Sequence, residues 1–452
     1  MNILLIVISI LLSVICVLLA LFQHYYFINK LYKRPSLKYD VPVFDDLIPS
    51  KENKFENNLN YPLQQIDDHD SDIVLNDLNS VLESRPQQKD TIGYILKNDK
   101  ATGTDSEVYN TLQAAIAFKL SGKSLKALKL FEHAAAIAPE NADVLNRYGE
   151  FLEQQHQDVL TADELYFKAL THSPNHEAAL TNRKRTAPVV EGLDYKLFKD
   201  IDKRNDFLKN RVKLGGFETV KKQAYYLHIY HTVGIEGNTM TVEQLRYLLQ
   251  TGQVVSGKSL VEHNEVLGIE KAMQYIKLLV RADYIGIKEI LGIHRRVMGH
   301  VDPIASGVFR DEKVFVGSHI PPPYEDIPDL MENYVEWLNS EEAQNMHPVR
   351  YAALAHYKLV DIHPFVDGNG RTSRLIMNMI LLKAGYPPVM VLKEQRETYY
   401  DSLKTANMGD VRPFVRFVAQ CTLQILDMYI YGTRFLSLEG NSEEGKKIIT
   451  FE

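Results

Sequence analysis

The longest uninterrupted apolar stretch of the chain lies at its start. Residues Ile3 to Phe22 read ILLIVISILLSVICVLLALF, twenty residues without a charged side chain, which is long enough to span a bilayer as a helix. A cleaved signal peptide has a shorter apolar region followed by a small-residue cleavage site, which this stretch lacks. The pattern therefore favours a single-pass transmembrane anchor over residues 1–23, with Tyr25, Tyr26 and Phe27 at the membrane interface.

Polar and acidic residues dominate the segment 24–103. Stretches such as ENKFENNLN and DDHDSD hold few apolar side chains, and no helical or strand period persists along them. A segment of this composition cannot bury a core of its own, so we expect a flexible stalk. At the other end of the chain, residues 433–452 are expected to form a tail.

Small and aromatic residues recur at a fixed interval within residues 104–183. Ala127, Phe131, Ala134 and Pro139 each have a counterpart 35 positions later, namely Ala162, Tyr166, Ala169 and Pro174. The interval is close to the tetratricopeptide period of about 34 residues, in which small residues let two helices approach and a proline ends each unit. The spacing predicts two tetratricopeptide repeats, which serve either as a peptide-binding groove or as a spacer.

The remainder of the chain shows helical periodicity. An apolar stripe on a charged background, between Leu193 and Val212, predicts a linker helix within 184–215. The segment 216–432 then reads as consecutive helices, with one short strand pair around 313–323. The predicted fold class is mostly α, with helical repeats joined by a linker helix to an all-α domain that carries a short β-hairpin.

Helix boundaries in the last domain are marked by specific residues. TVEQLRYLLQTG opens with a capping box from Thr241 to Gln244 and closes at Gly252. A further helix is predicted to run up to the residue before Pro364, and another is predicted to end at Gly385.

Composition and charge exclude some classes of function. The 452 residues are 45% hydrophobic and 24% charged, as in a globular protein, and the net charge of −7 gives no electrostatic footprint for nucleic acid. The two cysteines, Cys16 and Cys421, can form neither a disulfide framework nor a cysteine metal site.

The segment HPFVDGNGRTSR, residues 363–374, concentrates chemistry between two predicted helices. Pro364 ends the first helix, Phe365 is expected to anchor the loop in the core, and the Gly-Asn-Gly run permits a tight turn whose N–H groups converge on an anion. Asp367 offers one carboxylate, which suits Mg²⁺ shared with phosphates. His363, with an ordinary pKa of about 6.5, can act as a general base. Arg371 and Arg374, three residues apart on one helix, can bind further phosphates.

Other motifs fit this segment poorly. A dinucleotide-binding fingerprint needs a third glycine where Ser373 stands, and a phosphate-binding Walker loop needs a Gly-Lys-Ser/Thr run. A calcium-binding EF-hand needs glycine where Thr372 stands. His356 and His363 could share a metal only across a helix end, and a merely structural helix start explains single residues but not the whole set.

At every specified position HPFVDGNGRTSR resembles the motif HPFx[D/E]GNGRxxR of the Fic family, whose members mostly transfer AMP from ATP to protein hydroxyls. The resemblance implies that His363 is the catalytic base and that Asp367 binds Mg²⁺, with Mn²⁺ as an alternative. It also implies a set of nucleotide-binding residues, namely Gly368, Asn369, Gly370, Arg371 and Arg374.

Three further segments resemble parts of Fic proteins. TVGIEG, Thr232 to Gly237, is similar to the inhibitory pattern [S/T]xxxE[G/N], which implies that Glu236 pairs with Arg374 and blocks productive placement of ATP. The segment SGVFRDEKVFVGSHIPPP resembles a flap that holds the target, with Val316 at its edge. YYDSLKTANMGDVRPFVRF resembles a helix near the nucleotide, which makes Tyr400 and Asn407 candidates for nucleotide contacts.

The order of anchor, stalk, repeats, linker and Fic domain resembles that of membrane-anchored animal Fic adenylyltransferases. This resemblance implies a single-pass protein of the endoplasmic reticulum membrane with a lumenal catalytic domain, homodimeric, that acts on the chaperone BiP in the unfolded protein response. It implies removal of AMP as well as its transfer, with Glu236 serving both. The positive residues Lys30, Lys33, Arg34 and Lys38 argue instead for a cytosolic bulk.

Two alternatives share these motifs. A Fic domain can transfer another phosphate-bearing group, since the motif specifies a phosphate site rather than the moiety that is transferred. The chain can also be a membrane-tethered tetratricopeptide adaptor whose Fic core only binds nucleotide, although the complete set of His363, Asp367 and both arginines speaks against it.

Overall fold

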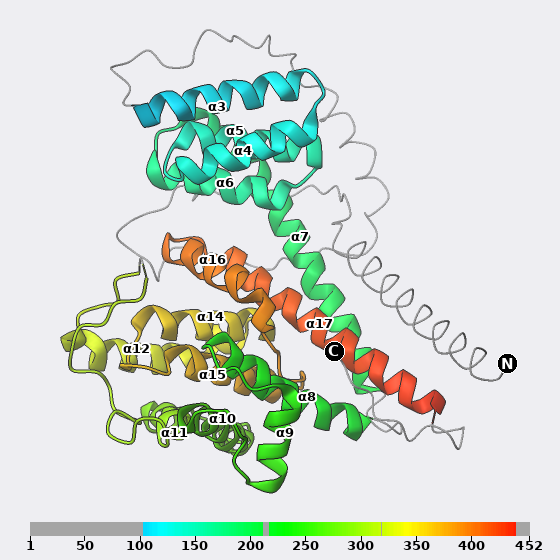
Figure 1. Ribbon diagram of the computed structural model, residues 1–452, viewed down its shortest axis with the longest axis vertical. Coiled ribbons are helices and arrows are strands. Elements are labelled where there is room, and N and C mark those ends of the chain that lie inside the picture. Colours follow the sequence, from blue (N-terminus) through cyan, green and yellow to red (C-terminus); the bar gives the residue numbers. More distant parts are fainter. Residues whose placement is uncertain (1–102, 211–216, 318, 440–452) are drawn as a thin grey trace, which may run out of the picture. The chain divides into compact units, whose positions relative to one another are not determined.

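The structure of the protein, a computed structural model, describes residues 103–210, 217–317 and 319–439 (Figure 1). The predicted anchor, the predicted stalk up to residue 102 and residues 440–452 of the predicted tail lie outside these ranges, whereas residues 433–439, also predicted as tail, are helical. Within the described ranges, every helix is too short or too polar to cross a membrane. The chain divides into two compact units, and the boundary between them lies at Gly192 and Leu193.

The first unit is built from two helical hairpins. Helices α3 (Gly103–Leu120) and α4 (Ser124–Ile137) pack together, as do α5 (Ala142–His156) and α6 (Val159–His172). The long helix α7 (Glu177–Lys209) follows and continues past the end of this unit. The helix predicted for 184–215 therefore begins earlier than expected, because no helix-breaking turn separates 177–183 from it.

The recurring residues of the first unit occupy equivalent buried positions. Ala127, Phe131 and Ala134 of α4 are at most 1% exposed, and their counterparts in α6 are fully buried. Gly149 of α5 lies so close to the ring of Tyr166 that a Cβ at this position would be 2.6 Å from the ring. Small residues thus allow close approach of α5 and α6, while the assignment to the tetratricopeptide class stays a prediction.

The second unit contains the end of α7 and ten further α-helices within the described ranges. In chain order they are α8 (Phe217–Ile235), α9 (Val242–Thr251), α10 (Leu260–Leu279), α11 (Ile287–Met298), α12 (Ile327–Leu338), α13 (Glu341–Gln344), α14 (Pro348–Ile362), α15 (Asn369–Lys383), α16 (Arg396–Asn407) and α17 (Arg412–Glu439). Two short 3₁₀ helices, Tyr324–Asp326 and Lys393–Gln395, precede α12 and α16.

Helix α15 is the centre of this unit. It packs against α14, α10, α11 and α8, and its apolar side chains are almost completely buried (Figure 1). A helix surrounded on all sides is expected to be hydrophobic around its whole circumference, which fits the run LIMNMILL. Its first turn, which contains the polar end of the HPFVDGNGRTSR segment, is therefore held by a rigid core.

The described residues confirm the mostly α fold class and several predicted boundaries. Thr241 and Gln244 form the reciprocal capping box of α9, and Gly252 ends that helix in the left-handed conformation. Helix α14 ends at Ile362, directly before the histidine and proline of the motif.

The strand pair predicted around 313–323 differs in extent. Among the described residues it is reduced to one isolated antiparallel bridge between Val316 and His319. Gly317 turns the backbone sharply between them, with φ at +57°. The three prolines at 321–323 have no N–H to extend the ladder, so no strand follows.

Candidate active site

The loop between α14 and α15 carries the candidate site. His363 adopts the left-handed conformation, φ 52° and ψ 57°, and its N–H donates to the Leu359 carbonyl 2.9 Å away. Gly368, with φ 77°, precedes α15 at its N-cap position. The chain thus makes two left-handed turns within six positions, and the second leaves backbone N–H groups free to converge at the helix start.

Asn369 braces this loop with its side chain. Its Oδ1 accepts from the N–H of Phe365 at 3.0 Å, and its Nδ2 donates to the carbonyl of the same residue at 2.8 Å. The Asn369 amide is therefore occupied by the loop backbone. The side chain shapes the anion-binding turn, and a phosphate would meet only the backbone N–H.

The His363 imidazole has a defined tautomer. Its Nδ1 lies 3.2 Å from the carbonyl oxygen of Val360, which can only accept, so Nδ1 carries the proton and Nε2 is the basic nitrogen. Burial lowers the pKa of His363 to about 4, and the positive groups of His319 and Arg310 act in the same direction. The imidazole is consequently neutral at physiological pH, which is the form that a general base needs.

His294 of α11 packs against the motif loop and hydrogen-bonds to it. Its ring stacks on Phe365 with centroids 3.7 Å apart and planes within 4°, and Phe365 is fully buried, as expected of an anchor. The N–H of Gly307 donates to Nδ1 at 2.8 Å, so Nε2 carries the proton and donates to the Asp367 carbonyl at 2.9 Å. No pattern in the sequence indicated this residue, because it lies 73 positions before Asp367.

Arg310 ties the predicted flap segment to the motif. Its Nε donates to the His363 carbonyl at 2.8 Å, and its backbone N–H donates to the Pro364 carbonyl at 2.9 Å. Its Nη2 reaches the Pro322 carbonyl at 2.6 Å. The guanidinium thereby fixes the His363 backbone against the segment that carries Val316, a role that the sequence alone did not indicate.

Arg374, the last residue of the motif, is paired with Glu236. The Glu236 Oε1 atom lies 2.6 Å from Arg374 Nη2, which also donates to the Thr232 carbonyl at 3.1 Å. Burial alone would lower the pKa of the Arg374 guanidinium, but the Glu236 carboxylate raises it. Arg374 is 2% exposed and therefore remains a buried cation held by one carboxylate.

Gly370 is the residue that gives this pair its space. A Cβ at position 370 would lie 3.1 Å from Glu236 Oε1 and 3.1 Å from Arg374 Nη1. Any side chain would therefore crowd the carboxylate and the guanidinium.

Arg371 contacts two acidic residues. Its Nη2 lies 2.7 Å from Asp367 Oδ2, and its Nη1 lies 3.4 Å from Glu265 Oε1 of α10. Burial raises the pKa of the Glu265 carboxyl. For Asp367, burial acts in the raising direction, but Arg371 lowers the pKa of that carboxyl overall. Both motif arginines are thus matched by acidic partners from helices outside the motif, of which the sequence indicated only Glu236.

The donor set at Asp367 suits a shared magnesium ion. Its carboxylate is 63% exposed beside the start of α15. Within the described residues, His, Cys, Asp and Glu side chains nowhere gather in a group of three that could hold a metal. One exposed carboxylate, hydrogen-bonded here to the Gly368 N–H and to Arg371, suits Mg²⁺ bound together with substrate phosphates rather than by a protein cage.

The three remaining candidate residues, Tyr400, Asn407 and Val316, lie outside the motif loop. Tyr400 is 40% exposed beside Arg396, and burial together with the nearby Glu236 charge raises its pKa. Asn407 is the last residue of α16 and is half-buried. Val316 is half-buried next to the fully accessible Phe315, and the neighbouring His319 is anchored to the Asp361 carbonyl of α14 at 3.1 Å.

His356 is a buried structural histidine. Its Nε2 lies 3.0 Å from the hydroxyl of Tyr399, whose ring also packs against Phe414. This hydrogen bond gives the side chain a role in the core, and a metal shared with His363 has no support.

Comparison with known proteins places the motif in a defined family. The model of the Fic/DOC family matches residues 284–381, from the loop before α11 to the end region of α15. The chain is 53% identical over 340 residues to a protein of Culex quinquefasciatus named "Protein adenylyltransferase Fic", a match that covers 75% of this chain and 68% of the relative. The Drosophila melanogaster protein of the same name is 52% identical over 350 residues, covering 76% and 71%.

A solved structure gives the same result. The structure of "Fic-1 (aa134 - 508) from C. elegans" superposes with a TM-score of 0.65 at 38% identity, covering 72% of this chain and 99% of that one. Motif, fold and relatives agree: the chain belongs to the Fic/DOC family.

Proposed function

We propose that the protein transfers AMP from ATP to hydroxyl groups of a client protein, and that Glu236 restrains this activity. The observation that carries the proposal is the juxtaposition, in one loop, of a neutral His363 with an anion-binding helix start and two buried arginines. The relatives named protein adenylyltransferases support the same reaction.

The chemistry follows from the protonation state of His363. A serine or threonine hydroxyl attacks the α-phosphorus of ATP, its proton passes to Nε2, and the bond between the α- and β-phosphates breaks to release pyrophosphate. The products are an AMP phosphodiester on the client and a protonated histidine, which returns its proton to solvent. The N–H groups at the start of α15 and the guanidinium of Arg371 stabilise the charge on the phosphates.

Asp367 would hold Mg²⁺, or Mn²⁺ in its place, together with phosphate oxygens of ATP. The bound ion neutralises phosphate charge. The exposed carboxylate and its contact with Arg371 set the place where the phosphates are received.

Glu236 acts as a lock in this proposal. Its carboxylate takes the Arg374 Nη2 group, which ATP would need for its γ-phosphate, and a charge-assisted pair of 2.6 Å is strong and geometrically specific. Release of Glu236 would open Arg374 to the nucleotide. The same carboxylate, which is 25% exposed, would hold a water molecule for hydrolysis of the AMP phosphodiester, so that one residue would restrain transfer and support removal.

The client and the location follow from the resemblance rather than from the site. We propose the chaperone BiP as client, with the protein as a homodimer in the endoplasmic reticulum membrane and its catalytic domain in the lumen. The accessible Phe315 and Ile320 on either side of the Val316 bridge support binding of an extended client segment by strand addition.

The test is mass spectrometry of a chaperone mixture incubated with ATP and the Glu236→Gly protein. We expect adenylyl adducts on serine or threonine of BiP, and none with the Glu236→Gly, His363→Ala double variant. Adducts that form equally with both variants would contradict the assignment of the base. ATP labelled at the α- or the γ-phosphate distinguishes AMP transfer, which retains only the first label, from transfer of another phosphate-bearing group.

A further inference from the structure

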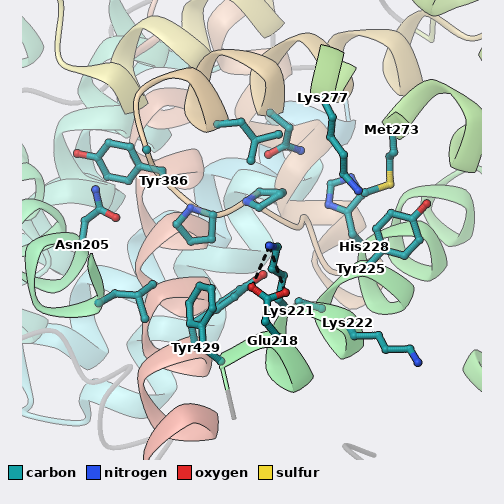
Figure 2. Close-up of a pocket in the computed structure, with 18 of the residues that line it drawn as sticks. Asn205, Glu218, Lys221, Lys222, Tyr225, His228, Met273, Lys277, Tyr386 and Tyr429 are labelled. Atoms are coloured by element: carbon teal, nitrogen blue, oxygen red, sulfur yellow. Dashed lines mark hydrogen bonds and ion pairs between the residues drawn. The ribbon is translucent and has the colours of Figure 1, made fainter. Parts of the chain in front are cut away.

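A cavity of about 530 Å³ opens in the second unit away from the motif loop. Its wall is formed by α8, α10, the end of α7, the segment after α15 and α17 (Figure 2). The volume falls within the range of small-molecule sites, which are mostly apolar clefts with a few placed polar groups.

The charges that line this cavity are unbalanced. Among the described lining residues, Glu218 is acidic and four are lysines, which are Lys209, Lys221, Lys222 and Lys277. Lys221 Nζ lies 3.2 Å from Glu218, and Lys277 Nζ lies 4.7 Å above the ring of Tyr225. Burial lowers the pKa of Lys277 and the positive charge of Lys221 lowers it further, while the Glu270 carboxylate of α10 acts in the opposite direction. An anion between these ammonium groups would relieve that repulsion.

The interior is largely apolar, with Asn378 and His228 among its buried polar side chains, and the Asn378 amide is hydrogen-bonded to the backbone of Val389. Met273, Ile276 and Leu382 line it together with aromatic and proline side chains. His228 of α8 is 3% exposed, and both of its ring nitrogens lack a hydrogen-bond partner in the described part of the chain. Figure 2 shows its ring between Met273 and Tyr225 on the cavity wall. A buried imidazole is normally hydrogen-bonded, so a bound molecule would complete its contacts.

The lysines that line the cavity and its largely apolar interior indicate which class of ligand fits. A nucleotide would bury the many polar atoms of its base and ribose against a largely apolar lining, which is costly. An acid with an apolar body places its charge among the lysines and its carbon chain against the lining.

We propose that this cavity binds a small amphipathic acid, with its anionic head among Lys221, Lys222 and Lys277 and with one hydroxyl or carbonyl of its body hydrogen-bonded to His228. The proposal concerns a second site and does not depend on AMP transfer.

The test is isothermal titration calorimetry of the full chain with decanoate, 10-hydroxydecanoate, decyl phosphate, decanol and decyltrimethylammonium. We expect saturable binding of one equivalent of the acids, at least about tenfold weaker binding of decanol, and no binding of the cation. Decyl phosphate binding much more tightly than decanoate identifies the phosphate head as the preferred anion. Decanol binding as tightly as decanoate would overturn the proposal, as would no heat with either acid.

Substitutions test the lysines and His228 of the proposed site separately. Lys221→Ala with Lys277→Ala should weaken decanoate binding by about tenfold or more, whereas Lys288→Ala, an exposed lysine of α11, should leave it unchanged. His228→Leu should abolish any preference for 10-hydroxydecanoate over decanoate. Thermal unfolding of each variant shows that it is folded. Affinity that stays unchanged in a folded double lysine variant contradicts the site.

Discussion

Glu236 Oε1 lies 2.6 Å from Arg374 Nη2, although 138 positions separate the two residues in the chain. The contact joins the end of α8 to the first turns of α15, and the Thr232 carbonyl completes it on the α8 side. The arginine that would receive the nucleotide is therefore already bonded to a carboxylate of the same chain.

Replacement of Glu236 by glycine should raise AMP transfer by at least about tenfold, because one charge-assisted hydrogen bond contributes roughly 1.5–3 kcal/mol. Removal of AMP from a modified client should cease in the same variant. Both activities are measured with labelled ATP and with purified modified client. Equal transfer by the variant and the wild-type chain would show that the pair does not restrain the enzyme. Glu341→Gly, at an exposed carboxylate that begins α13, is the matched control.

The same substitution should lower thermal stability. Arg374 would stay buried without its carboxylate, which typically costs a protein a few kcal/mol, about 3–5 for a fully buried pair and less here because Glu236 is 25% exposed. ATP with Mg²⁺ should then raise the melting temperature of Glu236→Gly more than that of the wild type, since the nucleotide supplies the missing negative charge. Differential scanning fluorimetry with and without ATP measures both effects, and an identical ATP-induced shift in the two proteins would contradict the expectation.

Replacement of His363 by alanine should stop transfer while ATP binding persists. Loss of a general base typically costs about 10²-fold or more in rate, and the ring lies beside the anion-binding turn without forming it. Transfer is measured in the Glu236→Gly background, and ATP affinity by calorimetry. Undiminished transfer would remove the assignment of the base, whereas simultaneous loss of ATP binding would indicate damage to the loop.

Transfer should depend weakly on pH near neutrality. The pKa of His363 is lowered to about 4, so the neutral, active form persists well below the ordinary pKa of histidine, which is about 6.5, and activity is lost only as pH falls toward 4. A rate profile of Glu236→Gly from pH 5 to pH 8 tests this, with circular dichroism at each pH to exclude unfolding. A decline centred near pH 6.5 in a folded protein would show that His363 is more exposed to solvent during turnover than in this structure.

Replacement of His294 by phenylalanine should reduce kcat more than it raises KM for ATP. Phenylalanine keeps the stacking on Phe365 but loses the hydrogen bonds to Gly307 and to the Asp367 carbonyl, so the motif loop loses its position rather than its chemistry. A reduction of about tenfold or more in kcat is expected from misplacement of the reacting groups. His300→Phe, an exposed histidine just after α11, should have no effect; equal losses in both variants would argue for a general destabilisation of α11.

The site was predictable from the sequence where its residues share one local segment. His363, Asp367 and the arginines lie within the twelve residues 363–374, and glycine and proline mark the turn that brings their groups together. Helix boundaries such as the capping box of α9 were predictable for the same reason, because side chains three residues apart decide them.

Most contacts between segments that lie far apart in the chain could not be predicted from the sequence. His294, Arg310 and Glu265 meet the motif across 73, 53 and 106 positions, respectively. Each is an ordinary helical or loop residue by its neighbours, and only tertiary contact gives it a role. The strand pair predicted around 313–323 was too long, because the turn at Gly317 and the following prolines limit pairing to one bridge among the described residues.

Gly370 belongs to the motif turn and also borders the Glu236–Arg374 pair. Gly370 has no side chain, and a Cβ at this position would lie 3.1 Å from each member of the Glu236–Arg374 pair. A substitution here would disturb the motif turn and this pair together. The segment after α8 that supplies Glu236 can change without altering the motif, whereas position 370 cannot change without affecting the pair.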